Sequence, residues 1–327
     1  MENNVLISAK GLKKYFPVSS FLGGKKKYIR AVDDIDLDIY KGETFGLVGE
    51  SGCGKSTLGK TLIRMYEPTA GKIYYKGEDI TDRKLNKIKS VQNSMQIIFQ
   101  DPYSSLNPFW NVEEILSEPL KNLKIKKGDM YESIKLILNK VGMSEYDLIK
   151  FPYEFSGGQR QRIGIARALL VNPEFIMCDE PIAALDVSIQ AQVVNLLQDL
   201  QKEFGLTYLF TAHDLSMVRY ISNRIGVMYL GSLVEIANSK SLFKKPLHPY
   251  TKALLSAVPS PDPSKKNINE KVKISGEVSQ VFADSNACRF APRCIYKTKI
   301  CEKECPKLRE IEGGHRVACH NAESINS

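Results

Sequence analysis

The sequence predicts an α/β fold with a mostly parallel central sheet, and three observations lead to this prediction. A glycine-rich loop, Gly49–Thr57, lies directly between an apolar strand-like run and a helical stretch. Short apolar runs alternate along the chain with longer amphipathic stretches, which is typical of strands joined by helices. One apolar run, Phe175–Cys178, ends in two acids, Asp179 and Glu180.

The predicted elements follow one another in a simple order. The opening, from Val5 to about Lys41, is β-rich: Ile35, Leu37 and Ile39 alternate with aspartates, as in a half-buried strand. Further strands are predicted over Thr44–Val48, Met95–Phe99, Phe175–Cys178, Leu206–Phe210 and Ile225–Leu230. Helices are predicted over Leu58–Met65, Tyr131–Val141, Gln159–Leu170 and Ser188–Phe204. The last has an apolar stripe formed by Ile189, Val193, Leu196, Leu197, Leu200 and Phe204.

The glycine-rich loop fits the phosphate-binding pattern G-x-x-x-x-G-K-[ST]. It consists of Gly49, Glu50, Ser51, Gly52, Cys53, Gly54, Lys55, Ser56 and Thr57. Glycines let the backbone approach a phosphate closely, and the N–H groups at the helix start point at the anion. Lys55 is expected to reach the β- and γ-phosphates of a bound nucleotide, and Ser56 to hold Mg²⁺. The sequence therefore predicts nucleotide binding.

Composition limits the class of protein. The chain has 327 residues, a net charge of +9 and 43% hydrophobic residues, as expected for a large globular domain with a smaller one. No apolar run approaches the length of a membrane span, and Met1–Asn4 begins no evident secretory signal. The basic residues are spread out, so nucleic acid is not an expected partner. We expect the protein to stay in the cytoplasm.

Two acids and a second glycine segment supply the remaining chemistry. Asp179 is expected to hold Mg²⁺ at the edge of the sheet, and Glu180 to orient or deprotonate the attacking water. A strand ending in solvated acids is the alternative. The segment Ser156, Gly157, Gly158 and Gln159 starts another helix. It is either a second anion site or a simple capping turn.

The ordered combination of these motifs resembles the ATP-binding cassette of ABC transporters over roughly residues 5–245. The resemblance implies a head-to-tail dimer of two cassettes. In it, ATP lies between the glycine-rich loop Gly49–Thr57 (the P-loop) of one cassette and Ser156–Gln159 of the other. Gln100 would then sense Mg²⁺ and the attacking water, Asp186 would contact the partner cassette, and His213 would contact the γ-phosphate. Phe16, or Tyr15 in its place, would stack on adenine. Phe155 and Ala183 depart from the commoner Leu and Ser, but neither change removes a catalytic group.

Three segments narrow the resemblance to the F-type ATPase of oligopeptide and dipeptide permeases. They are Gln100–Pro108, Leu247–Thr251 and the cysteine-rich tail from Cys288 to His320. The resemblance implies ATP-driven peptide import with a D-type ATPase partner, two transmembrane permease subunits and an extracellular peptide-binding protein. It places the chain on the cytoplasmic face of a bacterial or archaeal membrane. Import of nickel or another small solute by the same architecture is the alternative, followed by a soluble ABC ATPase without a transport role.

Domain boundaries follow from these assignments. We predict a nucleotide-binding domain over residues 1–245, with a helical subdomain at about 101–165, and an extension over 246–327. A linker rich in Pro, Ser, Lys and Asn runs from Pro259 to about Asn269.

The extension contains five of the seven cysteines of the chain. Apart from the close pair Cys301 and Cys305, their spacing is wider than that of structural zinc sites, while cluster ligation tolerates it. In the similar permease ATPases, four cysteines that match Cys288, Cys294, Cys301 and Cys319 hold a [4Fe–4S] cluster. Cys305 lies outside that pattern. Zinc and free thiols remain alternatives.

Overall fold

The computed structural model describes residues 4–18, 27–82, 91–257 and 286–326 of the chain. Contacts within the chain separate two compact units. The first unit comprises residues 1–4, 40–44 and 82–211, and the second comprises residues 5–39, 45–81 and 212–327. The predicted linker from Pro259 to Asn269 lies outside the described residues, and the boundary at residue 245 stays a prediction.

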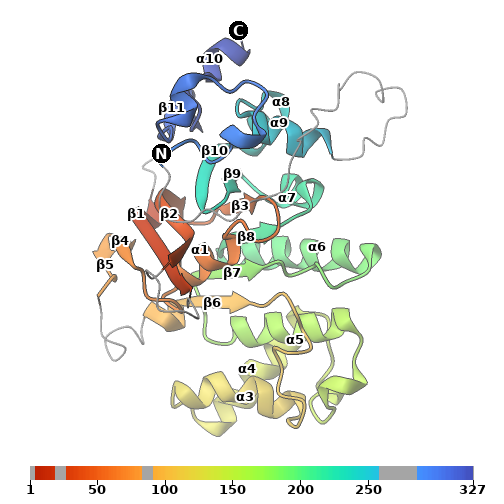
Figure 1. Ribbon diagram of the computed structural model, residues 1–327. Helices are drawn as coiled ribbons and strands as arrows, with labels where there is room; N and C mark the ends of the chain where they lie inside the picture. Colours follow the sequence, from red (N-terminus) through yellow and green to blue (C-terminus); the bar gives the residue numbers. More distant parts are fainter. Residues whose placement is uncertain (1–3, 19–26, 83–90, 258–285, 327) are drawn as a thin grey trace. The chain divides into compact units, whose positions relative to one another are not determined.

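The first unit combines a parallel sheet with a group of helices. Its strands are β6 (Met95–Ile98), β7 (Phe175–Asp179) and β8 (Thr207–Ala212). Its helices are α3 (Val112–Asn122), α4 (Lys127–Lys140), α5 (Gly157–Leu169) and α6 (Val187–Phe204), with single 3₁₀ turns at Glu145–Asp147 and Pro152–Glu154. The strands pair in parallel in the order β8-β7-β6. Figure 1 shows α3, α4 and α5 packed against one another.

Helix α6 shows where the predicted pattern holds and where it fails. Its buried residues are Val193, Val194, Leu197 and Leu200. Phe204, which the stripe predicted to be buried, is 38% exposed. It is the last residue of the helix before Gly205 turns the chain in the left-handed conformation, so the stripe ends one turn earlier than predicted.

The second unit contains an antiparallel sheet and a mixed one. In the antiparallel sheet the order is β2 (Lys27–Tyr40), β1 (Val5–Val18), β4 (Ala70–Tyr75) and β5 (Glu78–Asp79). The mixed sheet has the order β11 (Arg309–Glu312), β12 (His315–Val317), β10 (Ser232–Asn238), β9 (Arg224–Tyr229) and β3 (Thr44–Val48). Strands β3 and β9 are parallel, and the other pairs of this sheet are antiparallel. The helices of the unit are α1 (Lys55–Leu62), α7 (Leu215–Ile221), α8 (Ser239–Lys244), α9 (Pro249–Ser256) and α10 (Ala322–Asn326).

The residues after β10 are anchored to it by one buried carboxylate. Glu235 is fully buried and accepts the backbone N–H groups of Leu247 and His248 at 2.7 and 2.9 Å. Its carboxylate also lies 2.7 Å from Nε2 of His315 in β12, and β12 pairs with β10 at Glu235↔Val317. A small apolar core of Leu247, Val317 and Ala322 completes this attachment.

Candidate nucleotide site

The P-loop has the local structure that the sequence predicts. All five residues of β3 are buried, and α1 begins at Lys55 with Gly54 as its N-cap. Gly54 has φ +108°, and a Cβ at this position would lie 2.0 Å from the carbonyl oxygen of Ala31. Because no other residue type tolerates both conditions, the sharp entry into the helix depends on this glycine.

Lys55 spans the loop from its helical end to its strand end. Its ammonium group is almost completely buried and donates to the carbonyl oxygens of Gly49 and Glu50 at 2.9 and 3.3 Å. These bonds hold the charged group inside the curve of the loop, where a phosphate oxygen would be attracted to it. Ser56 and Thr57 follow in the first turn of α1.

The acids at the end of β7 meet Gln100 because of the strand register. Ile98 pairs with Cys178, so the residues two positions further on, Gln100 and Glu180, come out of the sheet side by side. The amide Nε2 of Gln100 donates to Oε2 of Glu180 at 3.0 Å. The structure thus brings together two of the predicted catalytic residues within the first unit.

Asp179 and Glu180 are both held by Thr211 of the neighbouring strand. Asp179 is 3% exposed and accepts the hydroxyl of Thr211 at 3.3 Å, while the N–H of Glu180 donates to the same hydroxyl oxygen at 3.0 Å. Glu180 adopts a left-handed conformation with φ +46°. For a residue other than glycine this costs on the order of 1–3 kcal/mol, and such strain persists where the surroundings fix it, often at functional sites.

The serine–glycine segment forms a capped helix start. Ser156 is the N-cap of α5: its hydroxyl accepts the N–H of Gln159, and the side chain of Gln159 accepts the N–H of Ser156 at 2.9 Å. The capping turn, which was the alternative to an anion site, is therefore present, and the second anion site stays a prediction. Gly158 has no space for a side chain, because a Cβ would lie 2.5 Å from Cγ2 of Ile189.

Arginines of α5 bind backbone carbonyl groups and tie the helix to the segment that follows Gln100. The guanidinium of Arg160 is 3.8 Å from the centre of the Tyr103 ring, and its Nε donates to the carbonyl of Pro152. Arg167 donates to the carbonyl of Ser105 at 2.7 Å. The two motifs, which lie more than 50 residues apart in the sequence, are thus mechanically connected within the first unit.

The remaining predicted residues lie at accessible positions. Phe16 contacts Tyr66 edge-on at 5.7 Å between ring centres, whereas the hydroxyl of Tyr15 donates to Asp33. This favours Phe16 over Tyr15 as the adenine-stacking residue. Asp186 is the exposed N-cap of α6, although its side chain makes no capping bond there, and His213 is exposed directly after β8.

Four cysteines of the tail line one small cavity in the second unit. They are Cys288, Cys294, Cys301 and Cys319. Burial, together with the neighbouring thiols Cys305 and Cys301, raises the pKa of Cys288 to about 12. Burial likewise raises the pKa of Cys294 and of Cys319. No group of three or more His, Cys, Asp or Glu side chains in the described ranges is arranged to hold a single metal ion.

Sequence reasoning did not identify a set of tail residues that contact the P-loop. Arg293 binds the carboxylate of Glu50, and the hydroxyl of Tyr250 accepts the N–H of Glu50. The sequence contains no spacing signal for these contacts, because positions 50 and 293 meet only through the fold of the residues after β10. Across the described part of the chain, no helix is long and apolar enough to cross a membrane.

Comparisons with known proteins agree with this geometry. Residues 32–183 match the family model "ABC transporter", and residues 234–301 match "Oligopeptide/dipeptide transporter, C-terminal region". The putative oligopeptide transport ATP-binding protein YkfD of Bacillus subtilis is 50% identical, over 98% of this chain and 97% of its own length. The dipeptide transport ATP-binding protein DppF of Haemophilus influenzae is 42% identical over 98% of both chains.

A solved structure extends the likeness to three dimensions. It is a dimeric ATP-binding cassette in a post-hydrolysis state, bound to ADP and Pi. It is 26% identical with a TM-score of 0.64 and covers 72% of this chain and 99% of its own. This supports the predicted cassette fold. The chain therefore belongs to the ATP-binding subunits of ABC-type oligopeptide and dipeptide transporters.

Proposed function

We propose that this chain binds and hydrolyses ATP to drive the import of oligopeptides or dipeptides through a membrane permease. The observation that carries the proposal is the contact between Gln100 and Glu180 beside the buried carboxylate of Asp179. A carboxylate held by an amide at the end of a parallel strand is a group that can orient a water molecule for attack on a phosphate. Membership of the peptide transporter family supports the substrate class.

Each residue has a distinct role in the proposal. Lys55 and the N–H groups at the start of α1 bind the β- and γ-phosphates. Ser56, Asp179 and Gln100 would hold Mg²⁺, whose positive charge would offset the charge of the phosphates. The fixed position of Asp179 on the Thr211 hydroxyl fits this role. Glu180 orients the water, and His213 contacts the γ-phosphate.

The complete site would be formed by two cassettes. In the proposal, Ser156–Gln159 of one cassette closes on ATP held by the other, and Asp186 contacts the partner cassette. The accessible Asp186 and the dimeric state of the similar cassette support this arrangement. We propose a D-type ATPase as the partner, two transmembrane subunits, an extracellular peptide-binding protein and a position on the cytoplasmic face of a bacterial or archaeal membrane.

The Glu180→Gln variant tests the proposed catalytic role. An amide at this position still offers an oxygen to Gln100 but cannot accept a proton. ATP binding should therefore remain, while kcat falls by about 10²–10⁴-fold. Glu203→Gln, which removes an exposed carboxylate at the end of α6, is the matched control. Near-normal turnover in Glu180→Gln would refute the role of Glu180.

Uptake in cells tests the substrate class. Labelled di-, tetra- and hexapeptides and Ni²⁺ are supplied to cells that carry the wild-type chain or Glu180→Gln. Loss of one peptide class would support peptide import and define its length range. Loss of Ni²⁺ uptake alone would make the chain part of a metal importer, and no loss at all would contradict the transport role.

We further propose that the four cavity-lining cysteines bind a [4Fe–4S] cluster with a structural role. Buried thiols that raise one another's pKa values need a cationic group before they can ionise together. A cluster of several irons accepts more widely spaced thiolates than structural zinc sites do, and the cavity brings the four thiols of the predicted set together. Anaerobic purification should give a brown protein that contains iron and sulfide, and a colourless protein with stoichiometric zinc would refute the proposal.

A further inference from the structure

The short segment from Cys288 to Cys294 reaches the P-loop directly through Arg293. The two guanidinium NH groups of Arg293 donate to the two carboxylate oxygens of Glu50, at 2.9 and 3.1 Å. The Arg293 side chain is only 10% exposed, and it also donates to the hydroxyl of Tyr229 at 3.3 Å. A two-pronged contact of this kind fixes both the position and the orientation of the carboxylate.

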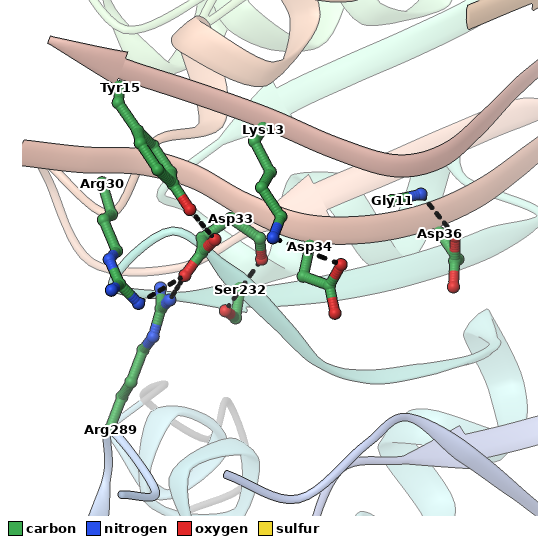
Figure 2. A network of polar contacts seen from close by, with 9 residues as sticks. All are labelled: Gly11, Lys13, Tyr15, Arg30, Asp33, Asp34, Asp36, Ser232 and Arg289. Carbon is green, nitrogen blue, oxygen red and sulfur yellow. Dashed lines mark hydrogen bonds and ion pairs between the residues drawn. The ribbon is translucent and has the colours of Figure 1, made fainter. Parts of the chain in front are cut away.

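A second arginine of the same segment reaches the P-loop through the turn between β9 and β10. Arg289 donates to the carbonyl of Leu230 and to the carboxylate of Asp33, where Figure 2 shows it meeting Arg30. The next residue of the turn, Gly231, donates its N–H to the carbonyl of Cys53 at 2.8 Å. The segment therefore supports the P-loop at two points, Glu50 and Cys53.

Aromatic packing makes this support rigid. Phe290, between the two arginines, packs against Tyr229 at 5.3 Å and Tyr250 at 5.5 Å between ring centres. Tyr250 is fully buried, and its hydroxyl accepts the N–H of Glu50 at 2.9 Å. The backbone of Glu50 is also held by Lys55, which donates to its carbonyl oxygen.

We propose that Arg293 is a positioning residue for ATP binding, acting through Glu50 on the shape of the P-loop. The inference rests on the proposed ATP-binding function. Phosphate binding requires the loop N–H groups and Lys55 to converge, and ordering a loose loop would consume part of the binding free energy. Arg293 holds the loop ordered before ATP arrives. The catalytic pair Gln100 and Glu180 belongs to the first unit, so Arg293 changes affinity and leaves the chemical step largely unaltered.

Coupling of this kind acts in both directions. If the segment improves ATP binding, ATP must stabilise the segment by the same factor. The backbone N–H groups of Ala291 and Cys294 provide a readout, because they donate to the carbonyl oxygens of Cys288 and Ala291 inside the segment. ATP should slow hydrogen exchange of these two N–H groups in the full-length protein.

The main test measures ATP affinity in the full-length chain with a non-hydrolysable analogue. Arg293→Met should raise Kd by about 5- to 30-fold, within the usual range of site coupling. The value of kcat at saturating ATP should change less than about threefold. The Kd of Arg293→Lys should lie between those of the wild type and of Arg293→Met, because lysine keeps the charge but loses the two-pronged contact. The matched control is Arg309→Met, which breaks another two-pronged pair in the same tail, with Glu323.

Several outcomes would overturn the inference. Equal Kd values in Arg293→Met and Arg309→Met would refute it. A fall in kcat of Arg293→Met without a change in its Kd would also refute it. A double-mutant cycle with Glu50→Gln must show that the two effects on Kd are not additive. If Arg293→Met fails to fold, Glu50→Gln alone replaces it: loss of one carboxylate oxygen from the two-pronged contact should raise Kd about two- to fivefold, and an unchanged Kd refutes the inference. Failure of the wild type to bind ATP would instead refute the proposed function.

Discussion

The contact between Gly158 and Ile189 predicts an unusual response to a small substitution. Gly→Ala inside a helix ordinarily stabilises by about 0.5–1 kcal/mol. At Gly158 the added Cβ would lie 2.5 Å from Cγ2 of Ile189, far inside an ordinary contact. Such overpacking costs about 1–3 kcal/mol. Gly158→Ala should therefore destabilise the first unit by about 1 kcal/mol.

Two matched variants make this prediction sharp. Gly164 lies in the same helix with open space where its Cβ would be, so Gly164→Ala should stabilise by about 0.5–1 kcal/mol. Ile189→Leu removes the Cγ2 branch at constant volume, so Gly158→Ala in that background should lose most of its penalty.

Urea unfolding followed by fluorescence measures these changes, because the single tryptophan, Trp110, belongs to the first unit. The reasoning is refuted if Gly158→Ala stabilises as Gly164→Ala does. It is also refuted if Ile189→Leu brings no relief.

Three further predictions concern the second unit. Gly54→Ala should abolish ATP binding because its Cβ would meet a backbone oxygen at 2.0 Å. Gly52→Ala has open space at its Cβ and only the strain of its left-handed φ of +76°, so it should weaken binding less; isothermal titration calorimetry compares the two. Glu235→Gln should lower the free energy of unfolding by about 1–3 kcal/mol, because the amide cannot accept both backbone N–H groups that the carboxylate accepts. Increased proteolysis of the tail would support this prediction, and unchanged cleavage would contradict it. Burial favours a higher pKa for Asp33, but its contacts with Tyr15, Arg289 and Arg30 lower the pKa below 3.8. The stability that the charge of Asp33 adds is therefore present above that pH and is lost as the pH falls further. The deficit of Asp33→Asn in thermal unfolding should thus be constant above pH 5 and shrink in acid.

Much of the fold and of the site could be predicted because the signals are local. The strand β7 and the acids after it follow from an apolar run and its end, and the cap at Ser156 follows from residue type and spacing. Predicting the contact between Gln100 and Glu180 would have required the register of two strands that lie about 80 residues apart in the sequence. The sequence indicated both strands but contained no measure of their relative shift. Phe204 was wrongly predicted as buried because periodicity does not show where the covering surface ends.

Contacts of the arginines were the least predictable part, and they explain how the motifs are held. Arg160 and Arg167 bind carbonyl groups and a tyrosine ring, and so attach α5 to the segment after Gln100. These contacts use the planar, multiply donating guanidinium, whose geometry lysine cannot reproduce. Counting charges in the sequence shows only that positive residues are spread along the chain. Their directional bonds instead connect segments that are remote in sequence, so changes far from ATP can alter how the ATP-binding motifs are placed.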